Sequence, residues 1–125
     1  KLNMKKILII EDESIISFGY QLQLERMGFE VSGRASSSAE AEILLKETNP
    51  DAIMMDVYLK GEKNGLELAR EIRRTDQMPI IFLTASSRPE IVDGISKLDH
   101  CHYLLKPIDP DGLNQVLYGI MDGHA

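Results

Sequence analysis

Five side chains that could do chemistry together each follow a short apolar run: Glu11, Asp12, Asp56, Thr84 and Lys106. Three are carboxylates, one is a hydroxyl and one is an ammonium group. Carboxylates held close together either have raised pKa values or bind a hard cation such as Mg²⁺, which leaves room for phosphate oxygens. The hydroxyl and the ammonium could then donate hydrogen bonds to an anion beside the metal. This combination is typical of a phosphoryl site, in which Asp56 could act as the nucleophile.

The apolar runs before these residues predict the strands of a parallel sheet. Ala52–Met55 is too short for a helix and has no polar alternation, as expected of a strand buried on both faces. Four more strands are predicted, at Lys5–Ile10, Phe29–Ala35, Met78–Leu83 and Tyr103–Leu105. Because parallel strands end at one edge and open α/β sheets bind ligands there, the five side chains are expected to converge.

Apolar residues at steps of three and four predict a helix after each strand. The first carries Ile15, Phe18 and Leu22 and closes near Gly28. The second carries Ala41, Leu44 and Leu45, and the third Leu68, Ala69 and Ile72. The fourth is short and carries Ile91, Ile95 and Leu98, and the last carries Leu113, Val116, Leu117, Ile120 and Met121. Five strands alternating with five helices predict one doubly wound α/β domain with helices on both faces.

Capping residues predict where the later helices begin. Serine and glutamate stand at capping-box spacing at two starts, Ser37 with Glu40 and Ser87 with Glu90. The other predicted N-caps are Asn64 and Asp109, and proline follows the latter at position 110.

Composition excludes several classes of protein. The chain has 125 residues, 43% hydrophobic and 27% charged, and contains no apolar run long enough for a membrane span. We expect neither a signal peptide nor direct nucleic-acid binding, since a net charge of −6 opposes phosphate contacts. The single cysteine, Cys101, favours a cytoplasmic location. Met4 is the expected natural start, with residues 1–3 left over from expression.

The sequence resembles the receiver domain of two-component response regulators over essentially all of Met4–Met121. The resemblance rests on these segments: Glu11-Asp12, Met55-Asp56, Asn64-Gly65-Leu66, Thr84-Ala85 and Tyr103-Leu104-Leu105-Lys106-Pro107. It implies a receiver domain at residues 4–122 followed by a tail at 123–125. It also implies a flavodoxin-like sheet with strand order 2-1-3-4-5.

The resemblance further implies Mg²⁺-dependent transfer of a phosphoryl group to Asp56, followed by slow hydrolysis. The donor would be the phosphohistidine of a sensor histidine kinase or phosphotransfer protein. The chain would thus catalyse its own phosphorylation and dephosphorylation without turning over a separate substrate. Asp12 and Asp56 would bind Mg²⁺, or Mn²⁺, through their side chains, Tyr58 through its carbonyl oxygen and Glu11 through water. Thr84 and Lys106 would hold the phosphoryl oxygens.

Tyr103 matches the family's switch aromatic, whose inward turn accompanies movement of Thr84. This motion would remodel the face of the fourth helix, fifth strand and fifth helix, which a downstream effector reads and which could form a homodimer. The sequence departs from the family pattern in the Glu-Asp pair, in a slightly long loop after Asp56, and in Asp99-His100, where Gly-Ala is usual. An ordinary strand aromatic is the other interpretation of Tyr103.

Other functions compete with a receiver. The same fold could serve as a docking or dimerisation module that does not depend on phosphorylation. A haloacid-dehalogenase-like phosphatase is disfavoured because Tyr58 stands where its second acid would be, and a nucleotide-binding module because no glycine-rich phosphate loop is present. We expect no metal at His100-Cys101-His102, since neighbours in an extended segment alternate faces and no second ligand pair follows. His124 is expected to be solvated.

Overall fold

The chain alternates strands and helices throughout residues 5–121, the part that the computed structural model describes. The strands are β1 (Lys6–Ile10), β2 (Glu30–Ala35), β3 (Ala52–Asp56), β4 (Ile80–Thr84) and β5 (Cys101–Leu105). The helices are α1 (Ser14–Arg26), α2 (Ser38–Thr48), α3 (Gly65–Arg73), α4 (Pro89–Ser96) and α5 (Pro110–Met121). Within this part of the chain no helix is long and apolar enough to cross a membrane.

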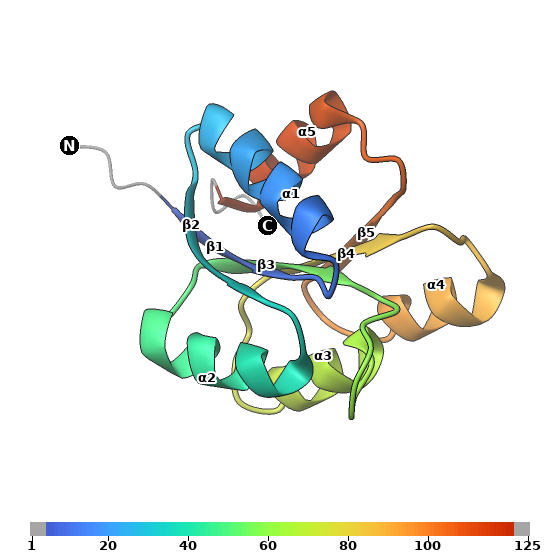
Figure 1. The fold of residues 1–125 in the computed structure, drawn as a ribbon. Coiled ribbons are helices and arrows are strands. Elements are labelled where there is room, and N and C mark those ends of the chain that lie inside the picture. Colours follow the sequence, from blue (N-terminus) through green and yellow to red (C-terminus); the bar gives the residue numbers. More distant parts are fainter. Residues whose placement is uncertain (1–4, 122–125) are drawn as a thin grey trace.

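The strands form one parallel sheet in the order β2-β1-β3-β4-β5. Helices α1 and α5 cover one face, and α2, α3 and α4 cover the other (Figure 1). This confirms the predicted doubly wound α/β fold and its strand order. The order reverses between β1 and β3, and such a reversal opens a crevice at the carboxyl ends of the strands.

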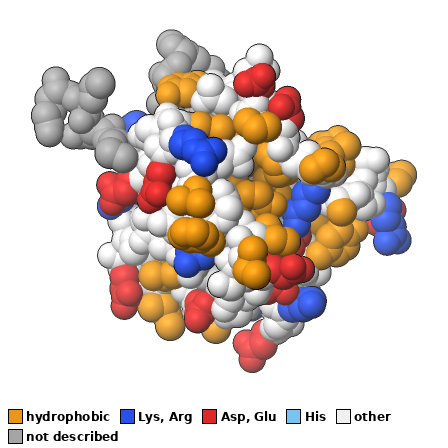
Figure 2. Space-filling view, turned by 45° about the horizontal axis from the view of Figure 1, so that its top comes forward, with side chains coloured by type: hydrophobic (Ala, Val, Ile, Leu, Met, Phe, Trp, Pro, Cys, Tyr) orange, Lys and Arg blue, Asp and Glu red, His pale blue; other side chains and the backbone are white. Residues whose placement is uncertain are grey.

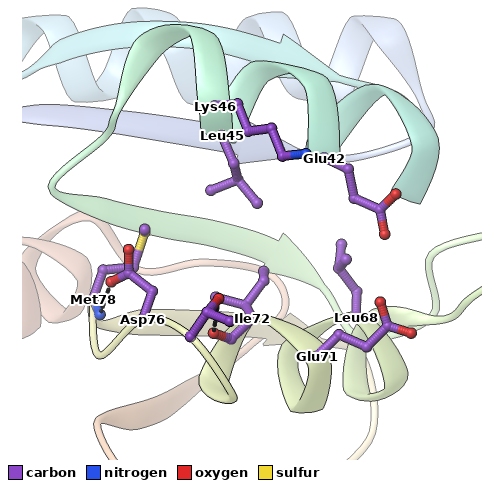
Figure 3. A pocket seen from close by; sticks show the side chains of 9 residues that line it. Glu42, Leu45, Lys46, Leu68, Glu71, Ile72, Asp76 and Met78 are labelled. Atoms are coloured by element: carbon purple, nitrogen blue, oxygen red, sulfur yellow. Dashed lines mark hydrogen bonds between the residues drawn. The ribbon is translucent and has the colours of Figure 1, made fainter.

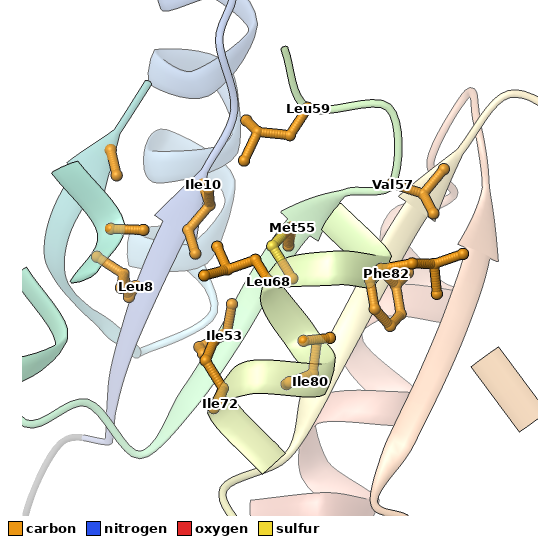
Figure 4. Packing of buried hydrophobic residues seen from close by; sticks show 14 of the residues in the cluster. Leu8, Ile10, Ile53, Met55, Val57, Leu59, Leu68, Ile72, Ile80 and Phe82 are labelled. Carbon is orange, nitrogen blue, oxygen red and sulfur yellow. The ribbon is translucent and has the colours of Figure 1, made fainter. Parts of the chain in front are cut away.

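Alternate side chains of the central strands point to opposite faces of the sheet and pack into two separate hydrophobic layers. On the face of α2, α3 and α4, Ile10, Met55 and Phe82 pack with Leu68 of α3 (Figure 4). The opposite layer combines the alternate strand residues with α5 and consists of these fully buried and nearly buried side chains: Ile7, Ile9, Leu24, Phe29, Met54, Ile81, Leu83, Leu113 and Leu117. Burial on both faces explains why β1, β3 and β4 appear in the sequence as continuous apolar runs.

Helix α1 is confirmed, but the apolar residues that reveal it lie on its outer side. Ile15 is 89% exposed, Phe18 49% and Leu22 41%. A second stripe packs inward toward the sheet, with Leu24 fully buried and Tyr20 packed against the same layer. The helix therefore has two apolar stripes, of which the inner one packs against the sheet and the outer one is exposed.

Two of the predicted helix starts are confirmed by side-chain hydrogen bonds. Asn64 forms a complete capping box with Glu67 at the start of α3. The Oδ2 atom of Asp109 accepts a hydrogen bond of 3.3 Å from the Gly112 backbone N–H, and Pro110 is the first residue of α5. Gly28, which follows α1, has φ 94°, the left-handed conformation of a helix-ending glycine.

The serine-glutamate pairs behave differently. Ser37 accepts a hydrogen bond from the Glu40 backbone, but the Glu40 carboxylate binds Ser36, so only half of that capping box forms. The predicted box of Ser87 with Glu90 is wrong. Helix α4 begins at Pro89, after the N-cap Arg88. The Arg88 guanidinium forms an ion pair of 2.7 Å with the Glu90 carboxylate.

Other element bounds shift by one or two residues, most clearly in β4, β5 and α4. Strand β4 starts at Ile80 instead of Met78, and β5 starts at Cys101, two residues before the predicted start. Helix α4 ends at Ser96, so Leu98 lies beyond it. The predictions for residues 1–3, Met4, the boundary at 122, the tail and His124 lie outside the described residues.

Candidate functional site

Three carboxylates meet at the carboxyl edge of the sheet, where the strand order reverses. Glu11 and Asp12 follow β1, and Asp56 ends β3. One carboxylate oxygen from each lies within 4.8 Å of the others. Glu11 is 3% exposed and Asp56 8% exposed, so much of this negative charge is withdrawn from water. The predicted convergence of these three side chains is present in the structure.

Backbone N–H groups hold two of the carboxylates in place. The Glu13 N–H donates to Glu11 Oε2 at 3.1 Å, and the Tyr58 N–H donates to Asp56 Oδ1 at 2.9 Å. The second oxygen of each carboxylate faces the ammonium group of Lys106. Its Nζ lies 3.6 Å from Glu11 Oε1 and 3.5 Å from Asp56 Oδ2. Lys106 therefore sits between the two most buried carboxylates.

The charges at this edge depend on one another. Burial raises the pKa of Glu11, the nearby charge of Asp56 raises it further, and the Glu13 N–H and Lys106 oppose the rise. Burial alone would lower the pKa of Lys106, but the negative charges around it, Asp56 foremost, outweigh burial and raise its pKa. Lys106 is thus held in its charged form beside Asp56.

The donor set suits a small hard cation. All three side chains offer carboxylate oxygens, the ligands that Mg²⁺ prefers. The buried Oε1 atom of Glu11 has no hydrogen-bond partner among the described residues. Buried polar atoms without partners are rare in folded proteins, and water or an ion commonly satisfies them. Glu11, Asp12 and Asp56 therefore fit a magnesium ion and its waters.

Thr84 lies at the end of β4 but its hydroxyl is engaged in its own turn. The residue is fully buried, its Oγ1 donates to the Ser86 carbonyl at 3.0 Å, and it accepts from the Ser86 N–H at 3.1 Å. Tyr103 on β5 is 38% exposed and borders a hollow of about 800 Å³ beside α4. Unlike Lys106, neither side chain makes a hydrogen bond or ion pair with the acidic cluster.

The loop after Asp56 contains contacts that sequence patterns did not indicate. The side chain of Lys60 is exposed, and its Nζ lies 3.9 Å from Asp12 Oδ2. Lys63 binds Glu42 of α2 at 2.8 Å and Glu71 of α3 at 2.7 Å, and these bonds raise the Lys63 pKa. Both glutamates line a hollow of about 250 Å³ between α2 and α3, whose side chains are drawn in Figure 3. None of the predicted site residues lines it.

Comparison with known proteins gives one consistent family. The model of the response regulator receiver domain matches residues 7–118. The transcriptional regulatory protein AfsQ1 of Streptomyces coelicolor is 41% identical over 107 residues, which are 84% of this chain and 46% of that protein. The transcriptional regulatory protein PdtaR of Mycobacterium tuberculosis is 33% identical over 103 residues, 82% of this chain and 50% of that protein. The chain thus spans about half the length of these curated relatives.

Solved structures agree with the sequence matches. The isolated receiver domain of RcsB from Salmonella enterica serovar Typhimurium, solved with the phosphomimetic BeF3−, has a TM-score of 0.87 at 26% identity. The match covers 97% of this chain and 91% of that one. A response regulator receiver domain protein from Clostridium thermocellum has a TM-score of 0.86 at 28% identity, with 97% of both chains covered.

Proposed function

This chain belongs to the response regulator receiver domain family of two-component signalling, and we propose that it accepts its phosphoryl group on Asp56. The observation that carries the proposal is the position of Lys106, whose ammonium lies 3.5 Å from Asp56 Oδ2 and 3.6 Å from Glu11 Oε1. A carboxylate nucleophile needs nearby positive charge to neutralise the charge of an incoming phosphoryl group. We assign the receiver domain to residues 4–122.

The proposed step is an in-line transfer to a carboxylate oxygen. Asp56 Oδ2 attacks phosphorus, the phosphorus–nitrogen bond of a phosphohistidine breaks, and the histidine nitrogen leaves with the electron pair of that bond. Oδ1 stays bound to the Tyr58 N–H, which fixes the direction of attack. Lys106 binds a phosphoryl oxygen as charge is transferred. Hydrolysis of the resulting acyl phosphate returns Asp56 to its starting state.

The acidic residues around Asp56 are proposed to hold Mg²⁺, and Mn²⁺ would suit the same oxygens. Asp12 and Asp56 would bind it through carboxylate oxygens, Tyr58 through its carbonyl oxygen and Glu11 through water. A bound divalent ion would neutralise the phosphoryl oxygens and relieve the repulsion among the carboxylates. The support on this chain is the set of three carboxylate oxygens within 4.8 Å of one another, together with Glu11 Oε1, which has no hydrogen-bond partner among the described residues.

We propose that Thr84 and Tyr103 change position when Asp56 is phosphorylated. In this structure the Thr84 hydroxyl binds Ser86 and Tyr103 is partly exposed. A phosphoryl group on Asp56 would offer the Thr84 hydroxyl a charged acceptor. A hydrogen bond to a charged acceptor is about twice as strong as one between neutral groups. Movement of Thr84 would free space for Tyr103 to turn inward and change the face of α4, β5 and α5. An effector protein or domain would read that face, which could also form a homodimer.

The outer stripe of α1 is proposed as the docking surface for the protein that donates the phosphoryl group. Ile15, Phe18 and Leu22 are large apolar side chains exposed on a helix that starts two residues after Asp12. Figure 2, with the top of the Figure 1 view brought forward, shows hydrophobic side chains gathered on this side of the molecule. A protein seated there would bring its phosphohistidine to the Asp56 edge. We place this exchange in the cytoplasm.

Mass spectrometry tests the assignment of Asp56. The chain is incubated with acetyl phosphate, with and without Mg²⁺, and compared with Asp56→Asn and with Asp111→Asn, an exposed aspartate of α5 as matched control. We expect a Mg²⁺-dependent phosphoryl adduct on the native chain and on Asp111→Asn, and none on Asp56→Asn. An equal adduct on all three proteins would refute the assignment, and no adduct on any would favour a docking module that works without phosphorylation.

A further inference from the structure

The loop between β3 and α3, residues 57–64, is fixed at both ends but not in its middle. Near its start, Leu59 is 3% exposed, and its N–H donates to the Asp56 carbonyl oxygen at 3.3 Å. At its end, the Gly65 N–H donates to the carbonyl oxygen of the first loop residue at 3.1 Å. Residues 60–62 are exposed and form no backbone hydrogen bond within the described part of the chain. Segments with few buried contacts open easily, so the shape of this loop depends on its side chains.

Lys63 is the side chain that ties the loop to its surroundings. Its ammonium binds Glu42 Oε2 of α2 at 2.8 Å and Glu71 Oε1 of α3 at 2.7 Å. Figure 3 shows these two carboxylates at the same end of the hollow between the helices. The Lys63 side chain is only 30% exposed, although it comes from a surface loop. Lys63 therefore joins the loop to both helices at once.

We propose that Lys63 is a positioning residue for the phosphoryl acceptor, because it holds the β3–α3 loop in the conformation in which the loop backbone orients Asp56. The inference rests on the proposed function, in which Asp56 is the acceptor. The ion pairs of Lys63 are with Glu42 and Glu71, neither of which belongs to the acidic cluster. Lys63 thus acts through the loop and does not touch the phosphoryl group.

The loop and the start of α3 orient Asp56 at two points. The Tyr58 N–H donates to Asp56 Oδ1 at 2.9 Å, which leaves Oδ2 facing Lys106. Gly65, two residues after Lys63, packs directly against the carbonyl oxygen of Asp56. Lys63 lies between these two contact points in the chain. Without its ion pairs, the free segment of the loop would extend from residue 60 to the start of the helix, and the hydrogen bond to Oδ1 would open more often.

Loss of the ammonium would also leave two like charges facing each other. Glu42 and Glu71 would share one end of the hollow with no cation between them, and like charges repel. The hydrogen bonds to Glu42 and Glu71 raise the pKa of Lys63, so it stays charged at neutral pH. Added salt screens exposed ion pairs and should therefore loosen the loop, whereas a pH change near neutrality should not.

Amide exchange at Tyr58 tests the proposal without metal or phosphodonor. The exchange rate of this N–H, measured by NMR, reports how often its bond to Asp56 opens. The amide of Met54, in the middle of β3, reports whether the whole fold is affected. Lys63→Met removes the charge, and Lys63→Arg keeps it. Lys46→Met is the matched control, because Lys46 lines the same hollow but belongs to neither ion pair.

We expect Lys63→Met to speed exchange at Tyr58 by about fivefold, an effect of the size that exposed ion pairs have, and to leave exchange at Met54 unchanged. Phosphorylation by acetyl phosphate in Mg²⁺ should slow by a similar factor. Lys63→Arg should restore both rates, and Lys46→Met should behave as the native chain does. Added salt should speed Tyr58 exchange in the native chain but not in Lys63→Met.

Equal Tyr58 exchange in the native chain and in Lys63→Met would overturn the proposal. Equal acceleration at Met54 would also overturn it, because Lys63 would then stabilise the whole fold. So would faster Tyr58 exchange with an unchanged phosphorylation rate, since the loop would then not matter for Asp56. Absence of a phosphoryl adduct on the native chain would count against Asp56 as the acceptor, whereas Tyr58 exchange would still decide whether Lys63 holds the loop.

Discussion

The backbone of Gly65 packs directly against the carbonyl oxygen of Asp56, so that a Cβ atom at residue 65 would lie 2.5 Å from that oxygen. The same Cβ would lie 2.9 Å from the Cα of Val57. Both neighbours are backbone atoms, which have little freedom to move aside. The start of α3 is therefore built onto the strand end that carries the proposed phosphoryl acceptor.

Gly65→Ala should destabilise the fold and misplace Asp56. Overpacking of a tight contact costs about 1–3 kcal/mol, and the displaced backbone is that of Asp56 itself. We expect a lower midpoint in urea and slower phosphorylation by acetyl phosphate. Gly19→Ala is the matched control, because a Cβ there meets nothing within 4 Å and alanine favours a helix. If both substitutions had the same effect, the contact with Asp56 would not be the cause.

Lys106→Met should separate phosphoryl transfer from metal binding. Loss of a positive group that stabilises transition-state charge costs about 100-fold or more in rate. Affinity for Mg²⁺ should be kept or increased, since the ammonium that competes for Glu11 and Asp56 is gone. Stopped-flow kinetics and Mg²⁺ titration measure the two quantities. Lys60→Met serves as the control. The Lys60 side chain is 83% exposed, and its loss removes only one ion-pair contact, of 3.9 Å with Asp12. Equal rates for the two variants would contradict the role of Lys106.

Glu11→Gln should stabilise the metal-free protein near neutral pH. A carboxyl group whose folded-state pKa is raised adds stability below its unfolded pKa of about 4.5, and this contribution is lost as pH rises through the folded-state value. The native chain should therefore lose stability relative to Glu11→Gln as pH rises from the unfolded pKa through the folded-state pKa, and the difference should level off above it. A gain of 1 kcal/mol would raise the melting temperature by about 4 °C in a domain of this size.

Calorimetry across pH measures this difference, and Glu47→Gln, an exposed glutamate of α2, is the control. Mg²⁺ should remove the advantage of Glu11→Gln, because the ion neutralises the native carboxylate. A stability difference that does not change with pH would show that ionisation of Glu11 is not responsible.

Ile15→Ala should affect only transfer from a protein donor. Its side chain is 89% exposed, so the substitution removes little packing within the domain. With a kinase domain that phosphorylates the native chain, we expect transfer to slow by about tenfold, the effect of losing roughly 1.4 kcal/mol at an interface. The rate with acetyl phosphate should not change. Ile43→Ala, an exposed isoleucine on α2, is the matched control. Equal slowing with both donors would mean that Ile15 supports the site and not the docking surface.

Much of the fold and most of the site follow from local patterns in the sequence. The apolar run Ala52–Met55 could be read as a buried strand because it is too short for a helix and has no polar face. Asp56 at its end, and Glu11 after β1, could be placed at one edge because parallel strands end together. Asn64 could be identified as a helix cap because asparagine favours that position and the apolar face of a helix follows it, whereas its partner Glu67 was seen only in the structure.

Long-range contacts decided what these patterns left open. Apolar spacing predicts α1 but does not distinguish its outer stripe from its inner one, because only the sheet determines which side is covered. Ser87 is not the N-cap of α4, because the helix begins at Pro89 after Arg88, and the Glu90 carboxylate binds the Arg88 guanidinium instead. Lys106 follows β5 and Asp56 ends β3, with β4 between these strands. The distance of 3.5 Å between Lys106 Nζ and Asp56 Oδ2 therefore depends on strand order and register. Residue types therefore determined which chemistry is available, while tertiary packing determined which groups meet to perform it.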